Sequence, residues 1–204
     1  MAKNRIITNP NLSVVITNNG KPSLMVNVDG HEIKLNGGSS PKPKNLIIEY
    51  VANSKPSSKW IDENCVDNIF DGSKGQLILK ECITKIEKLN SEQNIFDEGK
   101  EGNVKEVYIP LGIKEILRCA FDTCHGLTLV TIPNSVTIIG TNAFGNCISL
   151  STVKSYAIVP PELEVSAFAG IYKDATLIVP TGSVEVYKES DWVEYFPNIT
   201  DSPK

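Results

Sequence analysis

Apolar residues recur in a fixed order along the second half of the chain. The segment "IPLGIKEILRCAFDTCHGL", residues 109–127, is followed 23 positions later by "IPNSVTIIGTNAFGNCISL", residues 132–150. The proline, the alanine–phenylalanine pair, the next cysteine and the final leucine coincide without a gap, while the residues between them vary. Fixed spacing of apolar positions with variable residues between them is typical of a structural repeat.

The same pattern continues in weaker form toward both ends of the repeat. A shift of 30 positions places "QLILKECITKI" (76–86) on "EVYIPLGIKEI" (106–116). Phenylalanines mark successive units at positions 70, 96, 121, 144 and 168, with spacings of 26, 25, 23 and 24 residues. We therefore predict a solenoid of about five coils within residues 45–199, regular in the middle and altered in its last coil.

The period also predicts the elements of each coil. A unit of about 23 residues is too short to bury its own apolar face, so stacked units must share one core. Short segments such as 107–109 and 130–132 alternate inward and outward positions, which is typical of strands. We expect each coil to add one strand to a parallel sheet at a spacing of about 4.8 Å, with phenylalanine and leucine packed inside. The predicted fold class is a β-rich solenoid.

The two ends of the chain carry different patterns. Residues 1–36 contain short strands, and "LMVNV-DG-HEIKL" predicts a β-hairpin with a two-residue turn at Asp29–Gly30. The glycines and prolines of residues 37–44 predict a linker. At the other end, Ser183 is a candidate N-cap for a helical cap over the last coil, which would place Val184, Tyr187 and Trp192 against the core. Residues 200–204 are expected to form a tail.

Composition and charge exclude several classes of protein. The 204 residues carry a net charge of −4 without a basic patch, which argues against nucleic-acid binding. No apolar run approaches the ~20 residues of a membrane-spanning helix, so membrane insertion is not expected. Polar residues and Pro10 interrupt the first fifteen residues, so no signal peptide is readable there. Either a leader is missing from this chain or the protein reaches its place by another route.

The reactive residues form no catalytic or metal-binding pattern. The five cysteines make no CxxC pair, and His31 and His125 are the only histidines, so we expect neither a zinc site nor a cofactor. Cys124 and Cys147 share a repeat position and are expected to stack as reduced core residues rather than form a disulfide. Phosphate-binding loops, zincin motifs and nucleophile elbows are absent from the sequence. We therefore predict that the chain is not an enzyme.

The segment 132–150 resembles the BspA-type leucine-rich repeat, whose pattern is roughly IPxSVTxIGxxAFxxCxxLxxV. The resemblance is strong over residues 104–199, degenerate over 45–103 and absent over 1–44. The coil at 109–127 departs from the pattern at Leu117 and Cys119, which leaves its local turn shape open. The resemblance implies a right-handed leucine-rich-repeat superhelix without catalytic activity. It also implies display on a bacterial surface or secretion, and adhesion to host proteins or to other cells.

The solvent face of the sheet is the expected place for a ligand, because it is rigid and extended. Residues between two inward-facing strand positions should face outward, and three of them become candidate ligand-binding residues: Tyr108, Thr131 and Ile178. Three more flank these strands: Lys105, Thr128 and Lys154. Tyr108 is the sharpest candidate, because tyrosine offers a large rigid contact area at low entropic cost.

Two functions fit these observations. The leading hypothesis is a surface-displayed or secreted leucine-rich-repeat module that binds a protein or glycan on a cell surface. The alternative is a structural virion protein, such as a phage head or tail fibre, which needs no signal peptide. In the alternative, residues 1–36 join other copies or other assembly subunits, and the solenoid is the exposed head. An enzyme is the weakest hypothesis, for want of a site.

Overall fold

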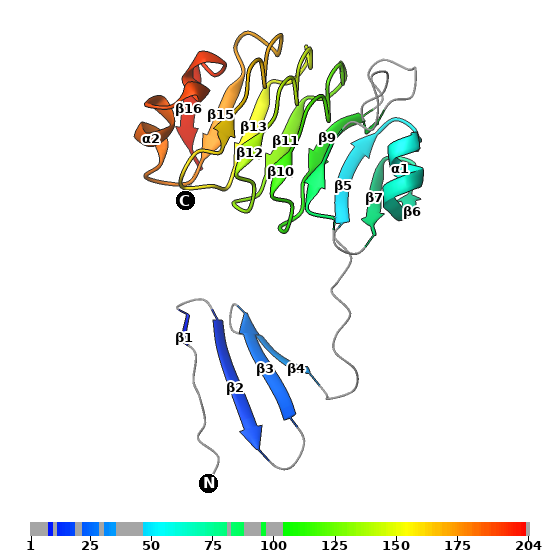
Figure 1. Cartoon of the computed structure of the whole chain (residues 1–204), viewed down its shortest axis with the longest axis vertical. Helices are drawn as coiled ribbons and strands as arrows, with labels where there is room; N and C mark the ends of the chain where they lie inside the picture. Colours follow the sequence, from blue (N-terminus) through cyan, green and yellow to red (C-terminus); the bar gives the residue numbers. More distant parts are fainter. Residues whose placement is uncertain are drawn as a thin grey trace. The chain divides into compact units, whose positions relative to one another are not determined.

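The computed structural model describes residues 8–9, 12–18, 22–28, 31–35, 47–80, 83–87, 95–96 and 104–202. The chain forms two compact units, Met1–Lys44 and Asn45–Lys204. The first is a small antiparallel sheet and the second is a stack of coils (Figure 1). The expected linker at 37–44, the turn at Asp29–Gly30 and Cys82 lie outside the described residues.

Unit 1 is a sheet of four antiparallel strands in chain order. Its strands are β1 (Thr8–Asn9), β2 (Leu12–Asn18), β3 (Pro22–Val28) and β4 (His31–Leu35). The predicted hairpin is confirmed, because Val28 pairs with His31 and leaves two residues to connect β3 and β4. Antiparallel neighbours with such short connections need few residues, which explains how so short a segment forms four strands.

Unit 2 is built on a sheet whose C-terminal part is parallel, as the repeat predicts. Its strands there are β9 (Val104–Tyr108), β11 (Leu129–Ile132), β13 (Thr152–Ser155), β15 (Thr176–Val179) and β16 (Asn198–Asp201). Val107, Val130, Val153 and Leu177 stand in register on successive strands and are fully buried. The predicted solenoid of stacked coils is therefore confirmed.

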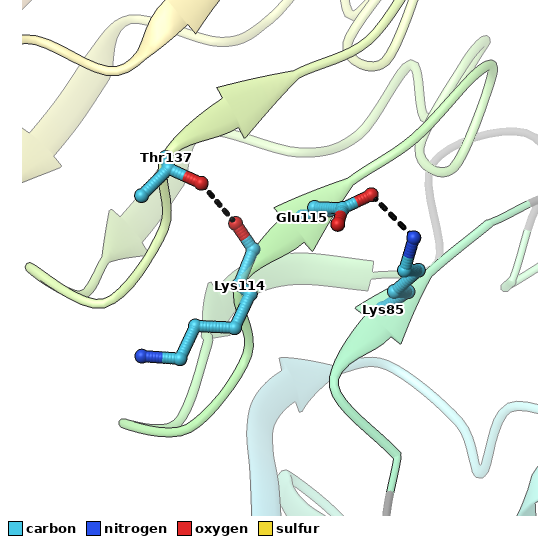
Figure 2. A network of polar contacts seen from close by, with 4 residues as sticks. All are labelled: Lys85, Lys114, Glu115 and Thr137. Carbon is cyan, nitrogen blue, oxygen red and sulfur yellow. Dashed lines mark hydrogen bonds and ion pairs between the residues drawn. The ribbon is translucent and has the colours of Figure 1, made fainter.

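A second, shorter parallel sheet closes each coil. It consists of β8 (Lys85–Ile86), β10 (Glu115–Ile116), β12 (Ile138–Ile139) and β14 (Glu162–Leu163). Polar contacts link its neighbouring coils (Figure 2): the Thr137 hydroxyl donates to the Lys114 carbonyl at 3.3 Å, and Lys85 pairs with Glu115 at 2.8 Å. Lys85 is half exposed, so this ion pair adds little to the stability of the fold. Lys85 and Glu115 are register partners on β8 and β10.

Phenylalanine rings from the turns fill the core between the two sheets. The ring centroids of Phe121 and Phe144 lie 5.0 Å apart, and the angle between the ring planes is 2°. For Phe144 and Phe168 the centroid distance is also 5.0 Å and the interplanar angle is 4°. The turn shape survives the departures at 109–127, because Cys119 adopts a left-handed φ of 55°, as Asn142 does one coil later at 53°. Each coil therefore repeats the same turn even where its residues differ.

The described residues form four coils rather than about five, since the second sheet has four strands there. Residues 47–80 instead form a front segment of antiparallel strands with one helix: β5 (Ile47–Ala52), α1 (Lys59–Asn64), β6 (Cys65–Phe70) and β7 (Lys74–Leu79). The strands continue the main sheet in the order β9-β5-β7-β6. The alignment of residues 76–86 with 106–116 is correct for Ile86, which pairs with Ile116 on the neighbouring coil. It is wrong for Leu77, which pairs with Ile48 instead of Val107, because β5 lies between β7 and β9.

The predicted C-terminal cap is confirmed. It comprises α2 (Val184–Lys188), the 3-10 helix η1 (Asp191–Glu194) and β16. Tyr187 and Trp192 are buried, and the indole of Trp192 donates to the Pro161 carbonyl at 2.8 Å. Ser183 is the N-cap residue of α2, as predicted, and its carbonyl accepts from the Tyr187 amide at 3.1 Å, but its side chain makes no capping hydrogen bond. The expected tail at 200–204 is also too long, because β16 pairs with β15 as far as Asp201.

Three buried cysteines of the described residues carry free thiols: Cys65, Cys119 and Cys147. Cys124 is partly buried. Burial raises the pKa of the Cys65 and Cys147 thiols to about 12, so both stay protonated at neutral pH. A protonated, buried thiol behaves as a small apolar side chain, which is the role expected from the sequence.

Candidate functional site

One row of outward-facing positions crosses all eight strands of the main sheet. Register pairs connect its members from β6 to β16: Ile69, Gln76, Glu49, Tyr108, Thr131, Lys154, Ile178 and Thr200. Four of the six residues singled out from the sequence therefore stand side by side. Because neighbouring strands lie about 4.8 Å apart, such a row presents one continuous surface.

Exposure differs sharply within this row. Tyr108 is 36 % exposed, and Lys154 and Ile178 are partly exposed, but Thr131 is only 7 % exposed. The expectation that Thr131 is available to a ligand is therefore wrong. Its short side chain stands between the longer Tyr108 and Lys154 on the adjacent strands, which shield it from solvent.

Lys105 and Thr128 lie outside the row, at the beginnings of β9 and β11. The amide and the hydroxyl of Thr128 both donate to the Lys105 carbonyl, at 2.8 and 2.9 Å. The next coil repeats the contact, since the Ser151 amide donates to the Thr128 carbonyl at 3.2 Å. These positions tie one coil to the next, so the structure does not bring them together with Tyr108.

A hollow of about 560 Å³ lies where the front segment meets the first parallel strand. β5, β6, β7, β9 and the β6–β7 turn supply its lining residues: Glu49, Tyr50, Val51, Ile69, Asp71, Lys74, Gly75, Gln76, Glu106 and Tyr108. The pairing of strands changes at this place from antiparallel to parallel, and β5 carries a register shift between Val51 and Ala52. Irregularities of this kind bend a sheet locally and re-aim side chains.

Hydrogen bonds fix the polar side chains of this hollow. The Tyr108 hydroxyl donates to a carboxylate oxygen of Glu106 at 2.5 Å, and the amide of Gln76 donates to Glu49 at 3.1 Å. The pKa of Tyr108 is raised to about 12, first by its hydrogen bond to Glu106, then by partial burial and by the negative charges of Glu106 and Glu49. Tyr108 is therefore a neutral phenol at physiological pH, held beside two carboxylates.

The two carboxylates of the hollow, Glu49 and Glu106, are hydrogen-bond acceptors. Among the described residues, neither Glu49 nor Glu106 has an ion-pair partner within 4 Å. Within the described residues, Glu49 accepts a side-chain hydrogen bond from Gln76 and Glu106 accepts one from Tyr108, and each carboxylate has capacity for more. The hollow can thus accept hydrogen bonds from donors that a ligand supplies.

The rim of the hollow is a rigid turn between β6 and β7. One oxygen of the Asp71 carboxylate accepts from the amides of Ser73 and Lys74, at 2.9 and 2.7 Å. These bonds hold the pKa of Asp71 below its usual range. Gly72 between them has a φ of 107°, which other residues rarely adopt. The rim is therefore fixed before any ligand arrives.

Comparison with known families agrees with the coils. Residues 92–190 match the family described as "BspA type Leucine rich repeat region (6 copies)". This region of the chain belongs to that family. The match suggests a protein-binding, surface-associated repeat module of a kind that is typically non-catalytic. No curated protein matches the chain.

Within the described ranges, no helix is long and apolar enough to cross a membrane. Over the same part of the chain, no three histidine, cysteine or acidic side chains cluster in a way that could hold a metal ion. The hollow at Tyr108 offers a ligand hydrogen-bond acceptors and one aromatic surface.

The leucine-rich repeat also carries residues of this face that the sequence interpretation missed. Tyr156, which follows β13, is 49 % exposed, and the Lys154 ammonium lies 5.5 Å from its ring centroid. Strand alternation from the inward Ser155 would have placed Tyr156 outward, and the same rule applied to Val107 would have found Glu106. Glu49 and Gln76 carry no such signal, because their position depends on pairing between distant segments.

Proposed function

We propose that this leucine-rich repeat module is displayed on a surface or secreted and mediates adhesion by binding a protein or glycan through the face of its main sheet. The observation that carries the proposal is the hollow at the junction of β5, β7 and β9. There an exposed tyrosine stands between two carboxylates that have no ion-pair partner among the described residues. Tyrosine is enriched in protein interfaces and among the residues that contribute most to their binding energy.

The chemistry of the hollow fits both classes of partner. A tyrosine ring packs against an apolar side chain or the apolar face of a sugar, and it loses little entropy on binding. Glu49 and Glu106 can accept hydrogen bonds from sugar hydroxyls or from N–H groups of a protein. Gln76 keeps a second amide hydrogen for an acceptor on the partner.

The hollow is also preorganised. Tyr108 and Gln76 are each tied to a carboxylate, and the turn at Asp71 is held by two backbone amides. Side chains that are ordered before binding lose less conformational entropy when the complex forms. Beyond the hollow, Lys154 and Tyr156 extend the face along the sheet, so a larger partner can add contacts there.

An array experiment tests the proposal. The fluorescently labelled 204-residue chain is applied to printed arrays of glycans and of extracellular-matrix proteins, beside Tyr108→Ala and the matched control Tyr172→Ala. Tyr172 is 43 % exposed and lies outside the sheet face. We expect binding that falls at least ~10-fold in Tyr108→Ala and stays unchanged in Tyr172→Ala. Binding that survives Tyr108→Ala, or that both substitutions reduce equally, contradicts the proposal.

The second candidate function is a structural virion protein with the solenoid as its exposed head. The division of the chain into an antiparallel sheet and a separate solenoid unit favours it. Antibodies against the solenoid would then label purified phage particles in electron micrographs and leave bacterial cells unlabelled. Labelling of the cells alone supports the surface module instead.

A further inference from the structure

The hollow at Tyr108 has an excess of acidic side chains. Its lining contains three acidic residues and one basic residue, Lys74, which gives a formal net charge of −2. Asp71 and Lys74 lie at the two ends of the turn between β6 and β7, where their opposite charges offset each other. Glu49 and Glu106 remain, because neither has an ion-pair partner within 4 Å among the described residues. The hollow is therefore complementary in charge to a cation.

The two glutamates lie close to each other on neighbouring strands. Glu49 on β5 pairs directly with Tyr108 on β9, and Glu106 lies two residues before Tyr108 on the same face of β9. Diagonal neighbours of this kind are about 7–8 Å apart at the backbone, which long side chains can span. The pKa of Tyr108 is raised first by its hydrogen bond to Glu106 and also by the charges of both glutamates. A cationic group beside the Tyr108 hydroxyl would thus be within reach of both carboxylates.

Apolar surface flanks the carboxylates on both sides. In the outward row, Ile69 is 49 % exposed on one side of Glu49, and the ring of Tyr108 stands on the other side. Arginine and lysine carry an apolar stem below a charged head, so apolar walls suit them as well as an acceptor does. A tyrosine ring also attracts a cation to its face. This sheet already contains such a contact, between the Lys154 ammonium and the ring of Tyr156.

The chemistry of the hollow matches a cation more closely than a sugar. A sugar hydroxyl both donates and accepts hydrogen bonds, whereas ammonium and guanidinium groups only donate. Ionised carboxylates only accept, and the Tyr108 hydroxyl already donates to Glu106. The centre of the hollow therefore has acceptors to spare, and a group that carries donors together with positive charge complements it best.

We propose, building on the sheet-face binding proposed above, that the partner is a protein that inserts an arginine or lysine side chain into the hollow. The charged head lies between Glu49 and Glu106 and against the ring of Tyr108, and the apolar stem points toward Ile69. A guanidinium can donate to both carboxylates at once, because its five N–H groups form a planar fork. The net charge of −4 on the chain adds a long-range attraction for a basic partner.

Peptide selection tests the basic side chain. A phage library of random dodecapeptides is selected on the immobilised 204-residue chain, and fluorescence anisotropy measures the Kd of each recovered peptide. Each peptide is compared with a copy in which the basic residue is uncharged, with citrulline in place of arginine or acetyl-lysine in place of lysine. We expect the recovered peptides to contain arginine or lysine. The Kd should be at least ~10-fold higher for the uncharged copy, because it loses the charge-assisted hydrogen bonds.

Substitutions in the chain locate the contact. Glu49→Gln and Glu106→Gln keep the size of the side chain and remove its charge. The matched control Glu162→Gln removes an exposed charge from the second sheet. We expect each of the first two variants to raise the Kd of the basic peptide at least ~5-fold, and Glu162→Gln to leave it within ~2-fold. Added salt should weaken binding to the unsubstituted chain more than binding to the two hollow variants.

Four results would overturn the basic partner. They are recovered peptides without a basic residue, an uncharged copy that binds equally well, equal effects of Glu162→Gln and the two hollow variants, and a selection that yields no binding peptide. If a glycan then binds on the array and Tyr108→Ala abolishes its binding, the face binds a sugar and its proposed function stands. If peptides or glycans bind and Tyr108→Ala has no effect, or if nothing binds in either assay, the proposed function of the face fails as well.

Discussion

The regular coils over residues 104–179 and the front segment over residues 47–80 build one continuous sheet by different rules. In the coils, each strand lies parallel to the strand of the previous coil, and equivalent residues stand in register. In the front segment, β5, β7 and β6 pair antiparallel, and β5 meets the first coil at β9. The repeat fixes the first arrangement, whereas a local hairpin and one long-range pairing produce the second.

The aromatic rings of the core show the same difference. In the coils, the turns supply one phenylalanine each, and Phe121 and Phe144 stack almost parallel. At the front, the ring comes from a strand: Tyr50 lies over Gly75, whose added Cβ would be 2.1 Å from the tyrosine ring. Tyr50 lies parallel to Phe70 with ring centroids 6.1 Å apart, and it is tilted by 58° from Phe96 at 5.9 Å. The regular coils therefore stack their rings at 5.0 Å, whereas the rings at the front lie about 6 Å apart beside the hollow.

The largest expected effect comes from removing a ring from the regular stack. Phe144→Ala should lower the free energy of unfolding by about 4 kcal/mol, since the cavity opens between two packed rings. Phe96→Ala should lower the free energy of unfolding by less, because the ring of Phe96 is tilted against those of Tyr50 and Phe121 and lies about 6 Å from both. Urea denaturation of both variants measures the difference. Equal losses would mean that regular stacking adds nothing to the stability of the coils.

A methyl group between coils should have the next largest effect. An added Cβ at Gly140 would lie 2.8 Å from the carbonyl carbon of Leu117 on the preceding coil. Backbone atoms cannot turn aside, so we expect Gly140→Ala to cost about 2 kcal/mol. Gly182→Ala is the control, because its Cβ meets nothing within 4 Å and only its φ of 85° opposes the change. A thermal unfolding midpoint that falls further for Gly182→Ala than for Gly140→Ala would contradict close packing between coils.

Relieving backbone strain in one coil should give a smaller change of opposite sign. Thr123 has a φ of 60°, where its β-branched side chain is unfavourable, and Asn146 takes the same place one coil later at 54°. Thr123→Asn should therefore raise the free energy of unfolding by about 1 kcal/mol. Asn146→Thr should lower it by a similar amount. Chemical denaturation of this pair checks the idea, which fails if the two changes have the same sign.

The smallest effect concerns ionisation at the hollow. The pKa of Tyr108 is raised from 10.0 to about 12, first by its hydrogen bond to Glu106. The folded protein therefore holds this proton more tightly than the unfolded chain, and the stability that it contributes is lost as the pH rises from 10 to 12. Absorbance titration at alkaline pH should show one late-ionising tyrosine fewer in Tyr108→Phe. In Glu106→Gln this tyrosine should ionise earlier, and an unchanged curve would contradict the hydrogen bond.

Local patterns in the sequence were sufficient to predict the coils and the cap. The arrangement of the front segment depends on long-range strand pairing, which these patterns do not contain. The repeat at 109–150 predicted the parallel strands, because each unit repeats the same apolar positions. It could not place β5 beside β9, since that pairing joins segments more than fifty residues apart with no shared motif. Tyr108 followed from strand alternation, but Glu49 beside it did not. The burial of Thr131 depends on the sizes of its neighbours across the sheet, which alternation ignores.

The central claim is that the main sheet binds its ligand at β9, where the antiparallel pairing with β5 meets the parallel pairing with β11. The most direct test compares two substitutions on the same outward row, Tyr108→Ala at the junction and Ile178→Ala within the regular coils, on the glycan and matrix-protein arrays. The account predicts a loss of at least ~10-fold for Tyr108→Ala and a change within ~2-fold for Ile178→Ala. The reverse order, or equal losses, would contradict a binding site at the junction.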